Sequence, residues 1–161
     1  MKKESVSFNI TVFDSIDELN EQDAMLLKEA RKVTQFAYAP YSNFHVGAFA
    51  KLENGKTVSG TNQENASFPA GICAERTLMS TASSLYPGVA IETIAISYNN
   101  VNGKSDTPVS PCGICRQSFV EFSDRTQKPI RIILSGREGE VQVIENARDL
   151  LPLVFAAEDM K

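Results

Sequence analysis

Hydrophobic and polar residues follow two different periods in the first forty positions of the chain. Residues 5 to 13 carry an apolar side chain at every second position from Val6 to Val12, which is the period of a strand. They predict a short edge strand, with a flexible arm as the alternative. From residue 21 to 39 the apolar positions recur at helical spacing, so a helix is predicted that ends at Pro40.

A capping-box pattern precedes this helix. Ser15 and Glu18 have the Ser-x-x-Glu spacing, in which each side chain can accept a hydrogen bond from the other residue's backbone N–H group. Asp17 and Asn20 are alternative caps, because both residue types are favoured at helix starts. The helix is therefore predicted to begin within or just after this segment.

The rest of the chain alternates strand-like and helix-like segments. Asn54-Gly55 stands between two strand-like runs, which is a strong β-hairpin signal. The turn from Gly136 to Gly139 is too short for a parallel crossover, so the strands beside it are predicted to be antiparallel neighbours. The order of elements predicts an α/β fold with a mixed five-stranded sheet and helices on both faces, in three αβα layers. Beyond the hairpin, helices are predicted at residues 73–85, 112–122 and 146–151, and strands at 91–98, 130–135 and 140–144.

Length, charge and the first residues limit the class of protein. A chain of 161 residues fits one domain. Its net charge is −4 and it has no long basic run, which argues against a nucleic-acid polymer as partner and fits a small neutral substrate better. The first ten residues lack the apolar core of a signal peptide, and no apolar stretch is long enough to cross a bilayer. We therefore expect a cytoplasmic protein with no membrane partner.

The chain has only three cysteines, and all lie at the starts of predicted helices. A reducing cytosol disfavours a disulfide framework, so a close Cys pair there is more often metal-binding or catalytic. Cys112 and Cys115 are three positions apart, which places both sulfurs on one helix face, and Cys73 opens another helix. Three thiolates leave a tetrahedral zinc ion one open position, as catalytic zinc sites do. The strand-like surroundings of His45 give it little weight as a fourth ligand.

Two charged residues beside Cys73, one acidic and one basic, suit a catalytic zinc site. Glu75 is rotated away from Cys73 on the helix and can face a substrate, where a carboxylate can move protons. Arg76 shares the helix face of Cys73 and can offset the negative charge of three thiolates, with Arg116 as the alternative. Taken singly, these features have ordinary explanations: a buried free cysteine for Cys73, and a redox pair for the Cys-x-x-Cys motif.

The cysteine-containing segments CAER and PCGICRQ together resemble the zinc-dependent cytidine deaminases, in the small all-cysteine form. The resemblance extends over roughly residues 21 to 159. It implies a cytidine-deaminase-like domain at residues 21–161 and an N-terminal extension at residues 1–20. Three further segments carry it: AYAPYSNFHVGA (37–48), GTNQENAS (60–67) and LLPLVF (150–155).

On the metal side, the resemblance implies that Cys73, Cys112 and Cys115 hold one zinc ion per subunit. Glu75 would be the catalytic proton carrier, and Arg76 would stabilise the negatively charged cysteine sulfurs. Thiolates that bind zinc and a carboxylate that moves protons are the residue types needed to activate a water molecule on zinc.

On the substrate side, the resemblance implies that Asn62 and Glu64 hold the ribose 3′-hydroxyl. Phe44 would pack against the pyrimidine ring, and the backbone N–H of Ala74 would read the edge of the base. Phe155 would help to close the pocket of a neighbouring subunit, since the family forms homotetramers with sites at subunit interfaces. Taken alone, Asn62 and Glu64 could be turn residues and the phenylalanines plain apolar packing.

The function that the resemblance implies is hydrolytic deamination in pyrimidine salvage. Cytidine, and also 2′-deoxycytidine, would become uridine or deoxyuridine plus ammonia. A zinc-bound hydroxide would attack carbon 4 of the ring while Glu75 protonates ring nitrogen 3 and then the departing amine. Three alternatives stay open: a deaminase of the blasticidin type for a cytosine-containing antibiotic, a binding module with a structural zinc ion, and an enzyme that edits nucleic acid.

Overall fold

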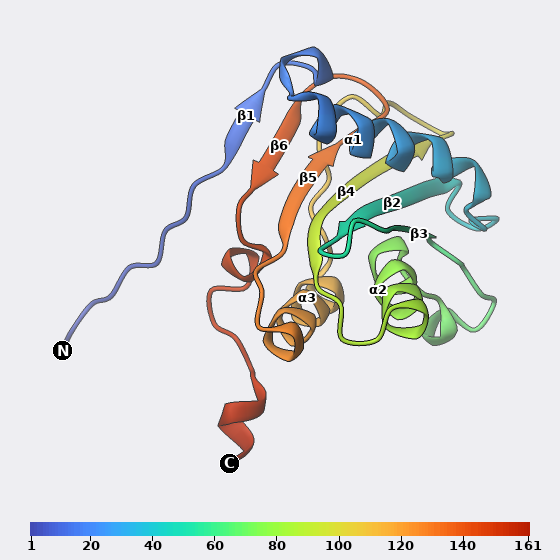
Figure 1. Cartoon of the computed structure of the whole chain (residues 1–161). Coiled ribbons are helices and arrows are strands. Elements are labelled where there is room, and N and C mark those ends of the chain that lie inside the picture. Colours follow the sequence, from blue (N-terminus) through green and yellow to red (C-terminus); the bar gives the residue numbers. More distant parts are fainter.

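The structure is a computed structural model that describes residues 1–161. Its centre is a mixed sheet of six strands in the order β1-β6-β5-β4-β2-β3 (Figure 1). Only β4 and β5 run parallel, and the other neighbouring pairs are antiparallel. The strands are β1 (Thr11–Phe13), β2 (Phe44–Leu52), β3 (Thr57–Thr61), β4 (Ile91–Asn100), β5 (Arg131–Ser135) and β6 (Val141–Ile144).

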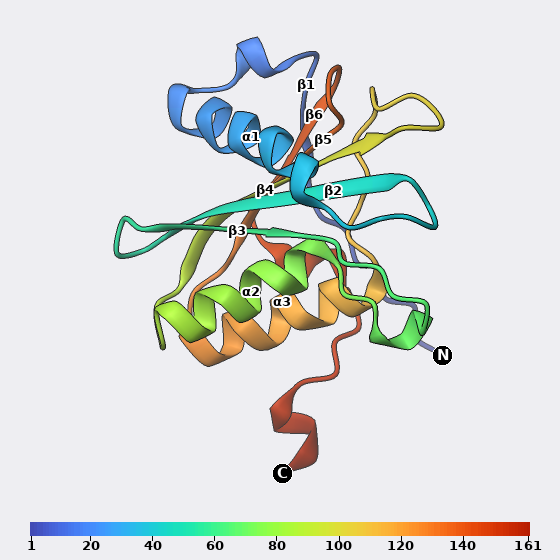
Figure 2. The same ribbon diagram turned by 90° about the vertical axis from the view of Figure 1, so that its right-hand side faces the viewer.

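Helices cover both faces of the sheet, as predicted. Helix α1 (Glu21–Val33) lies on one face, while α2 (Ala74–Leu85) and α3 (Gly113–Thr126) lie side by side on the other (Figures 1 and 2). The parallel pair β4 and β5 is joined through α3, which is the usual crossover between parallel strands. Short 3₁₀ helices occupy Ile16–Glu18, Thr34–Phe36, Phe68–Ala70, Ala147–Leu150 and Ala157–Met160.

The two faces of the central strands supply two separate cores. Side chains alternate along a strand, so Ile94 and Ile96 of β4 face α2 and α3, whereas Ala95 between them faces α1. The same alternation in β5 sends Ile132 to the first core and Ile133 to the second. The core under α2 and α3 has 20 buried residues and that under α1 has 7, so the pair of helices that begins at the cysteines is the more firmly packed.

The β2–β3 hairpin turns at Asn54-Gly55, as predicted, and Gly55 has the positive φ of 78° that this turn requires. Further along β3, Gly60 lies against the first turn of α2. A side-chain carbon at Gly60 would be 2.4 Å from both the Ala74 oxygen and the Leu78 nitrogen, so only glycine permits this approach. The contact fixes the start of α2 against the sheet.

The start of α1 uses one of the alternative caps. The Asn20 side chain accepts a hydrogen bond from the Asp23 N–H at 2.9 Å, so Asn20 caps α1. Ser15 instead caps the preceding 3₁₀ helix by accepting from the Asp17 N–H, and the Glu18 carboxylate accepts from the Asp14 N–H. The Ser15–Glu18 pattern therefore marks a short 3₁₀ helix of its own.

Three predictions about element boundaries are wrong. The sheet has six strands instead of five, because β1 adds to the edge of β6; only residues 11–13 pair, since β6 is itself short. Helix α1 ends at Val33, well before Pro40, because the Thr34 hydroxyl donates to the Arg31 carbonyl and the chain tightens into a 3₁₀ turn. The helix predicted at residues 146–151 is a single 3₁₀ turn.

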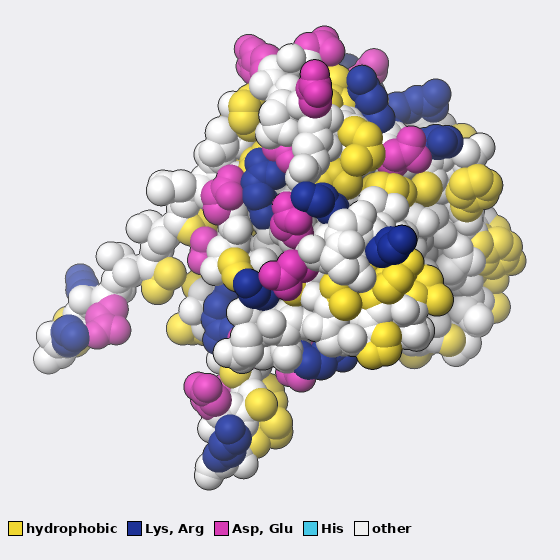
Figure 3. Space-filling model, viewed as in Figure 1, with side chains coloured by type: hydrophobic (Ala, Val, Ile, Leu, Met, Phe, Trp, Pro, Cys, Tyr) yellow, Lys and Arg dark blue, Asp and Glu magenta, His cyan; other side chains and the backbone are white.

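The two ends of the chain lie outside the body of the domain. Residues 1–10 are exposed and extend away from the sheet, and the C-terminal segment projects past α3 (Figures 1 and 3). Basic and acidic side chains are interspersed over the face that Figure 3 shows. No helix combines the length and the apolar character that crossing a bilayer requires.

Candidate active site

The three cysteine sulfurs converge between the starts of α2 and α3. Cys73 and Cys112 are the cap residues of these helices, and Cys115 lies in the first turn of α3. The Sγ atoms of Cys73 and Cys112 are 3.8 Å apart, and those of Cys112 and Cys115 are 3.6 Å apart. All three sulfurs lie within 4.8 Å of one another, and no His, Asp or Glu joins the group. His45, in β2, is accordingly no fourth member.

This geometry fits a zinc ion. Three sulfurs each about 2.3 Å from a tetrahedral zinc ion lie about 3.8 Å from one another, which matches the two short separations. The group supplies three ligands, so the fourth corner of the tetrahedron is left for a small molecule. Cys115 is buried, Cys73 is half-buried and Cys112 is exposed, so the group has a closed side and an open side.

Both helices begin without a side-chain cap. The backbone carbonyls of Cys73 and Cys112 accept the first helical hydrogen bonds, from Thr77 and Arg116, but neither sulfur bonds the first-turn N–H groups. Those N–H groups carry the partial positive charge of a helix N-terminus. Two such ends therefore face the sulfur group and offset the negative charge of thiolates.

Mutual contact also separates the acidities of the thiols. The pKa of Cys73 is lowered to about 6, first by its interaction with the nearby Cys115 side chain, with a smaller contribution from the charge of Arg76. The same interaction and burial raise the pKa of Cys115. Arg116, the alternative support for the sulfurs, is engaged elsewhere: its guanidinium donates to the carbonyls of Pro111 and Leu150.

A cavity of about 200 Å³ opens beside Cys73 and Cys112. Glu75 lies in its wall, is only 5% exposed, and has its pKa raised because burial disfavours the charged carboxylate. A carboxyl group with a raised pKa, beside a cluster of metal-ligating sulfurs, has the properties of a proton carrier. The size of the cavity suits a compact substrate.

The mouth of the cavity is formed by β2 and the chain that follows β3. The Phe44 ring stacks on Tyr98 of β4, with centroids 4.7 Å apart and planes at 14°. Asn62 ties this region together, because its side chain accepts from the Val46 N–H at 2.7 Å and donates to the Phe44 carbonyl at 2.8 Å. A side-chain amide has two donors and further acceptor capacity, so Asn62 retains hydrogen-bonding groups for a ligand.

Four of the predicted site residues do not line this cavity: Cys115, which is buried behind the other two cysteines, and Glu64, Arg76 and Phe155. Glu64 accepts hydrogen bonds from the Tyr41 and Ser42 N–H groups, and together with the Ser42 side chain these lower its pKa. Arg76 lines a separate groove between α2 and α3. Phe155 is 61% exposed and contacts α3 through its carbonyl, which accepts from Gln117. The predicted residues that do line the cavity are Phe44, Asn62, Cys73, Ala74, Glu75 and Cys112.

The cavity also contains residues that sequence reasoning missed. Tyr98 is the most informative: its ring stacks on Phe44, and its hydroxyl donates to the Thr107 carbonyl, which anchors the loop that enters α3. The alternation of β4 predicts which of its residues share a face, but only the packing decides which face borders a cavity. The remaining unpredicted wall residues are Val46, Ile96, Ser97, Val109 and Ser135.

Fold and site together define a class of protein: an αβα domain with a three-cysteine metal site at two adjoining helix starts and a buried glutamate beside it. Residues 20–128 match the family model of the cytidine and deoxycytidylate deaminase zinc-binding region. The chain is 39% identical to a cytidine deaminase of Halalkalibacterium halodurans over 136 residues, which are 84% of this chain and 96% of the relative. It is 35% identical to that of Sporosarcina psychrophila, with 84% and 92% covered.

Solved structures agree with these sequence relatives. A cytidine deaminase from Burkholderia pseudomallei superposes with a TM-score of 0.71 at 35% identity, covering 85% of this chain and 100% of the other. One from Mycobacterium tuberculosis gives 0.64 at 26% identity, with 86% and 99% covered. This chain therefore belongs to the cytidine and deoxycytidylate deaminase zinc-binding family, and zinc is its metal.

Proposed function

We propose that the protein deaminates cytidine hydrolytically, giving uridine and ammonia, and that it accepts 2′-deoxycytidine as well. One observation carries this proposal: two cysteines of the three-sulfur group, Cys73 and Cys112, and the buried Glu75 line the same small cavity. The relatives described above are cytidine deaminases. Conversion of free nucleosides places the enzyme in pyrimidine salvage.

Each residue of the site has a part in this reaction. Cys73, Cys112 and Cys115 hold zinc, which when bound supplies an activated water molecule as the nucleophile. Glu75 would take one proton from that water and deliver it to ring nitrogen 3. It would then take the remaining proton of the oxygen that has bonded to carbon 4 and deliver it to the amine, which leaves as ammonia. Arg76 supports the cysteines through its positive charge. Water enters, ammonia leaves, and no other reactant is needed.

Other residues in and beside the cavity orient the substrate. Phe44, held by its stack on Tyr98, provides a flat surface for the pyrimidine ring. The unsatisfied N–H of Ala74 at the start of α2 faces the edge of the base. Asn62 and Glu64 take the ribose 3′-hydroxyl, and Glu64 must then share its carboxylate with the N–H groups of Tyr41 and Ser42. A base without its sugar leaves these groups unpaired and binds poorly.

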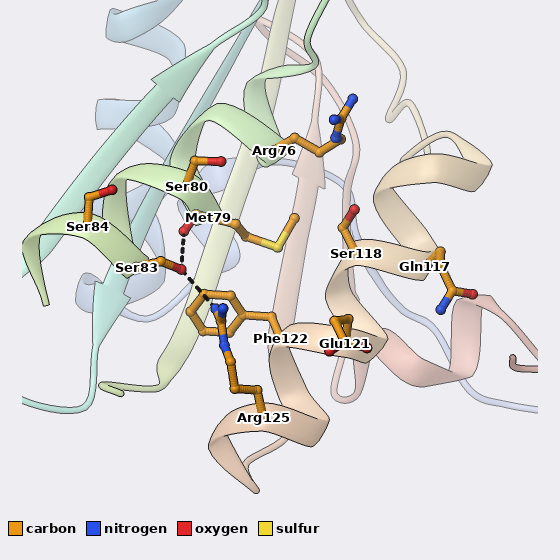
Figure 4. A pocket seen from close by; sticks show the side chains of 10 residues that line it. All are labelled: Arg76, Met79, Ser80, Ser83, Ser84, Gln117, Ser118, Glu121, Phe122 and Arg125. Atoms are coloured by element: carbon orange, nitrogen blue, oxygen red, sulfur yellow. Dashed lines mark hydrogen bonds between the residues drawn. The ribbon is translucent and has the colours of Figure 1, made fainter. Parts of the chain in front are cut away.

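We also propose that the protein works as a homotetramer whose sites lie at subunit interfaces. Phe155 is exposed and remote from the cavity of its own chain, so a role in the pocket of a neighbour accounts for its position. A groove of about 630 Å³ runs between α2 and α3 (Figure 4). Small side chains such as Ser80 and Ser118 line it, which allows a helix of another copy to approach closely. Large exposed apolar side chains, including Phe36, Tyr38, Tyr41 and Phe68, add surface for such contacts.

We propose the domain bounds and the cellular location on the same grounds. Residues 21–161 form the catalytic domain and residues 1–20 an extension of it, although β1 joins the extension to the sheet. The reduced thiols of the site fit a cytoplasmic location. A nucleic-acid polymer is no substrate, because a site that encloses the 3′-hydroxyl leaves no room for the next nucleotide.

The test is the ultraviolet absorbance of cytidine incubated with the purified protein, beside a measurement of bound zinc. Deamination is expected with about one zinc ion per chain, loss on removing zinc with a chelator, and recovery when zinc returns. Turnover of blasticidin but not of nucleosides would show that the substrate is a cytosine-containing antibiotic and not cytidine. Bound zinc without any turnover would indicate a structural site, and turnover of single-stranded DNA or RNA would indicate editing.

A further inference from the structure

A second concave site lies at the C-terminal end of α1, separate from the sulfur group. Its volume is about 580 Å³, and its walls come from the last turn of α1, from β2 and β4, and from the turn between β5 and β6. This volume falls within the roughly 300–1,000 Å³ of small-molecule sites. The proposed catalytic reaction makes no use of it.

The charge of this groove is opposite to that of the whole chain. Arg31, Lys32 and Arg137 line it together with His45, and no acidic residue is among its lining residues. The chain as a whole has a net charge of −4. A concave surface lined by one sign of charge concentrates ligands of the other sign, because its low-dielectric walls focus the field.

Arg31 is held in the groove by neutral acceptors and has no bonded carboxylate. Its guanidinium donates to the Gly136 carbonyl at 3.0 Å and to the Ser135 hydroxyl at 3.1 Å, and both acceptors are neutral. Burial lowers the pKa of Arg31, with only the more distant charge of Glu138 acting against it. A half-buried guanidinium without a bonded carboxylate is costly, and its geometry suits the paired oxygens of a phosphate. Lys32 has only a solvent-exposed partner, Glu29, at 3.4 Å.

We propose that this groove binds a phosphate-bearing small molecule. Arg31 and Arg137 contact its phosphate oxygens, with Lys32 adding a mobile positive charge at the rim. Asn99 and Gln35 line the same groove and add side-chain amide donors, although one donor of Gln35 is used by the Lys32 carbonyl at 3.0 Å. The groove is larger than one phosphate ion needs, so the ligand has either a second phosphate or an organic part. It shares only Ser97 and Tyr98 with the lining of the catalytic cavity. Its helical wall is α1, whereas that of the catalytic cavity is the starts of α2 and α3, which lie on the other face of the sheet (Figure 1).

Titration calorimetry of the zinc-loaded protein with inorganic pyrophosphate, and separately with ADP, tests this proposal. Saturable binding is expected, which weakens as ionic strength rises because the attraction is between charges. Arg137→Glu and Lys32→Ala are expected to weaken binding at least about tenfold and severalfold respectively, as losing charge-assisted contacts does. Lys28→Ala is the matched control: it removes an exposed cation from the same helix but lies outside the groove, so the affinity should stay within about twofold.

Three outcomes would overturn the proposal. The first is no saturable binding of either anion. The second is binding that Arg137→Glu leaves unchanged, which places the anion elsewhere, including at the zinc. The third is tighter binding of a short single-stranded oligonucleotide than of both small anions, which assigns the groove to a polymer. Because binding is measured directly, the result does not depend on whether cytidine is turned over.

Discussion

The three long helices of this domain begin in two different ways. At α1, the Asn20 side chain accepts from the Asp23 N–H, and Arg131 of β5 donates two bonds to the Asp23 carboxylate at 2.7 and 2.8 Å. At α2 and α3 the cap positions are Cys73 and Cys112, which make no cap bond. At the first start a side chain accepts from a first-turn N–H group, whereas at the other two no side chain does.

This difference separates stability from chemistry within one fold. At the start of α1 the cap position and the Asp23 carboxylate are both used within the protein, and the ion pair with Arg131 fastens α1 to the sheet. An uncapped start is less stable by itself, and it aims partial positive charge at whatever lies in front of it. Two uncapped starts meeting at one point can hold thiolates around a metal. Substitutions at the two kinds of start should therefore affect different properties.

The largest effect is expected for Cys112→Ser. Zinc binding and cytidine turnover should fall to background, because serine is a poor zinc ligand. Yet serine is a good helix cap, so the zinc-free variant should be as stable as the zinc-free wild type or more so, by about 0.5–1 kcal/mol. Metal analysis and urea unfolding of both chelated proteins measure this. A clear loss of zinc-free stability would show that the cysteine itself supports the start of α3.

Glu75→Gln should come next. The amide cannot carry the proton, so turnover should fall by about 10²–10⁴-fold while bound zinc stays at the wild-type level. Steady-state rates and zinc content, measured on the same preparation, check both halves. Unchanged turnover would remove Glu75 from the mechanism.

Asp23→Ala tests the satisfied start of α1. Asp23 is buried and Arg131 keeps no equivalent partner, so the free energy of unfolding should fall by about 3 kcal/mol. Glu145→Ala is the control, since this exposed partner of Arg131 should contribute less than about 1 kcal/mol. Turnover at 25 °C should be unchanged in both variants. A lower turnover in a variant that is still fully folded would show that the start of α1 also contributes to catalysis.

Asn20→Ala removes the cap of α1 and the hydrogen bond that Asn20 donates to the Asp23 carboxylate, but leaves the ion pair of Asp23 with Arg131. The cost should be about 1 kcal/mol, because one N–H of the first turn loses its acceptor. Chemical denaturation measures the loss, and the activity assay should give wild-type values. Asn20→Ser, which retains an acceptor, should recover most of the stability. An alanine variant as stable as the wild type would mean that water replaces the cap without cost.

The smallest effect is expected at Glu64. Its carboxylate accepts hydrogen bonds from N–H groups of a loop, much as the Asn20 side chain accepts one from a helix start. The pKa of Glu64 is lowered, chiefly by its hydrogen bond with the Ser42 side chain, so its contribution to stability is present above the ordinary value of 4.5. That contribution is lost as the pH falls through the lowered pKa. Thermal unfolding should therefore lose slightly more stability between neutral and acidic pH in the wild type than in Glu64→Gln. An equal loss in both proteins would contradict this.

Much of the site was predictable because its residues are close in sequence. The spacing of Cys112 and Cys115 places both sulfurs on one helical face, and the offset of Glu75 from Cys73 turns the carboxylate away from the sulfur. Both cysteine-led helices are confirmed. Tyr98 was not predictable, because its role depends on stacking with Phe44. Phe44 lies more than fifty positions away along the chain, on the neighbouring antiparallel strand β2. Helix α1 was predicted too long because Thr34 forms a local bond that hydrophobic periodicity does not register.

By itself, the sequence determined the chemical groups and their local geometry: three thiols and one acid at two helix starts, and the caps and turns that delimit each element. Only the tertiary structure decided that the two starts meet. Their meeting depends on β4 and β5 pairing in parallel through α3, and on the close contact of Gly60 with the first turn of α2. Such contacts join residues distant along the chain, and no local propensity encodes them, so they are settled by how the whole core packs.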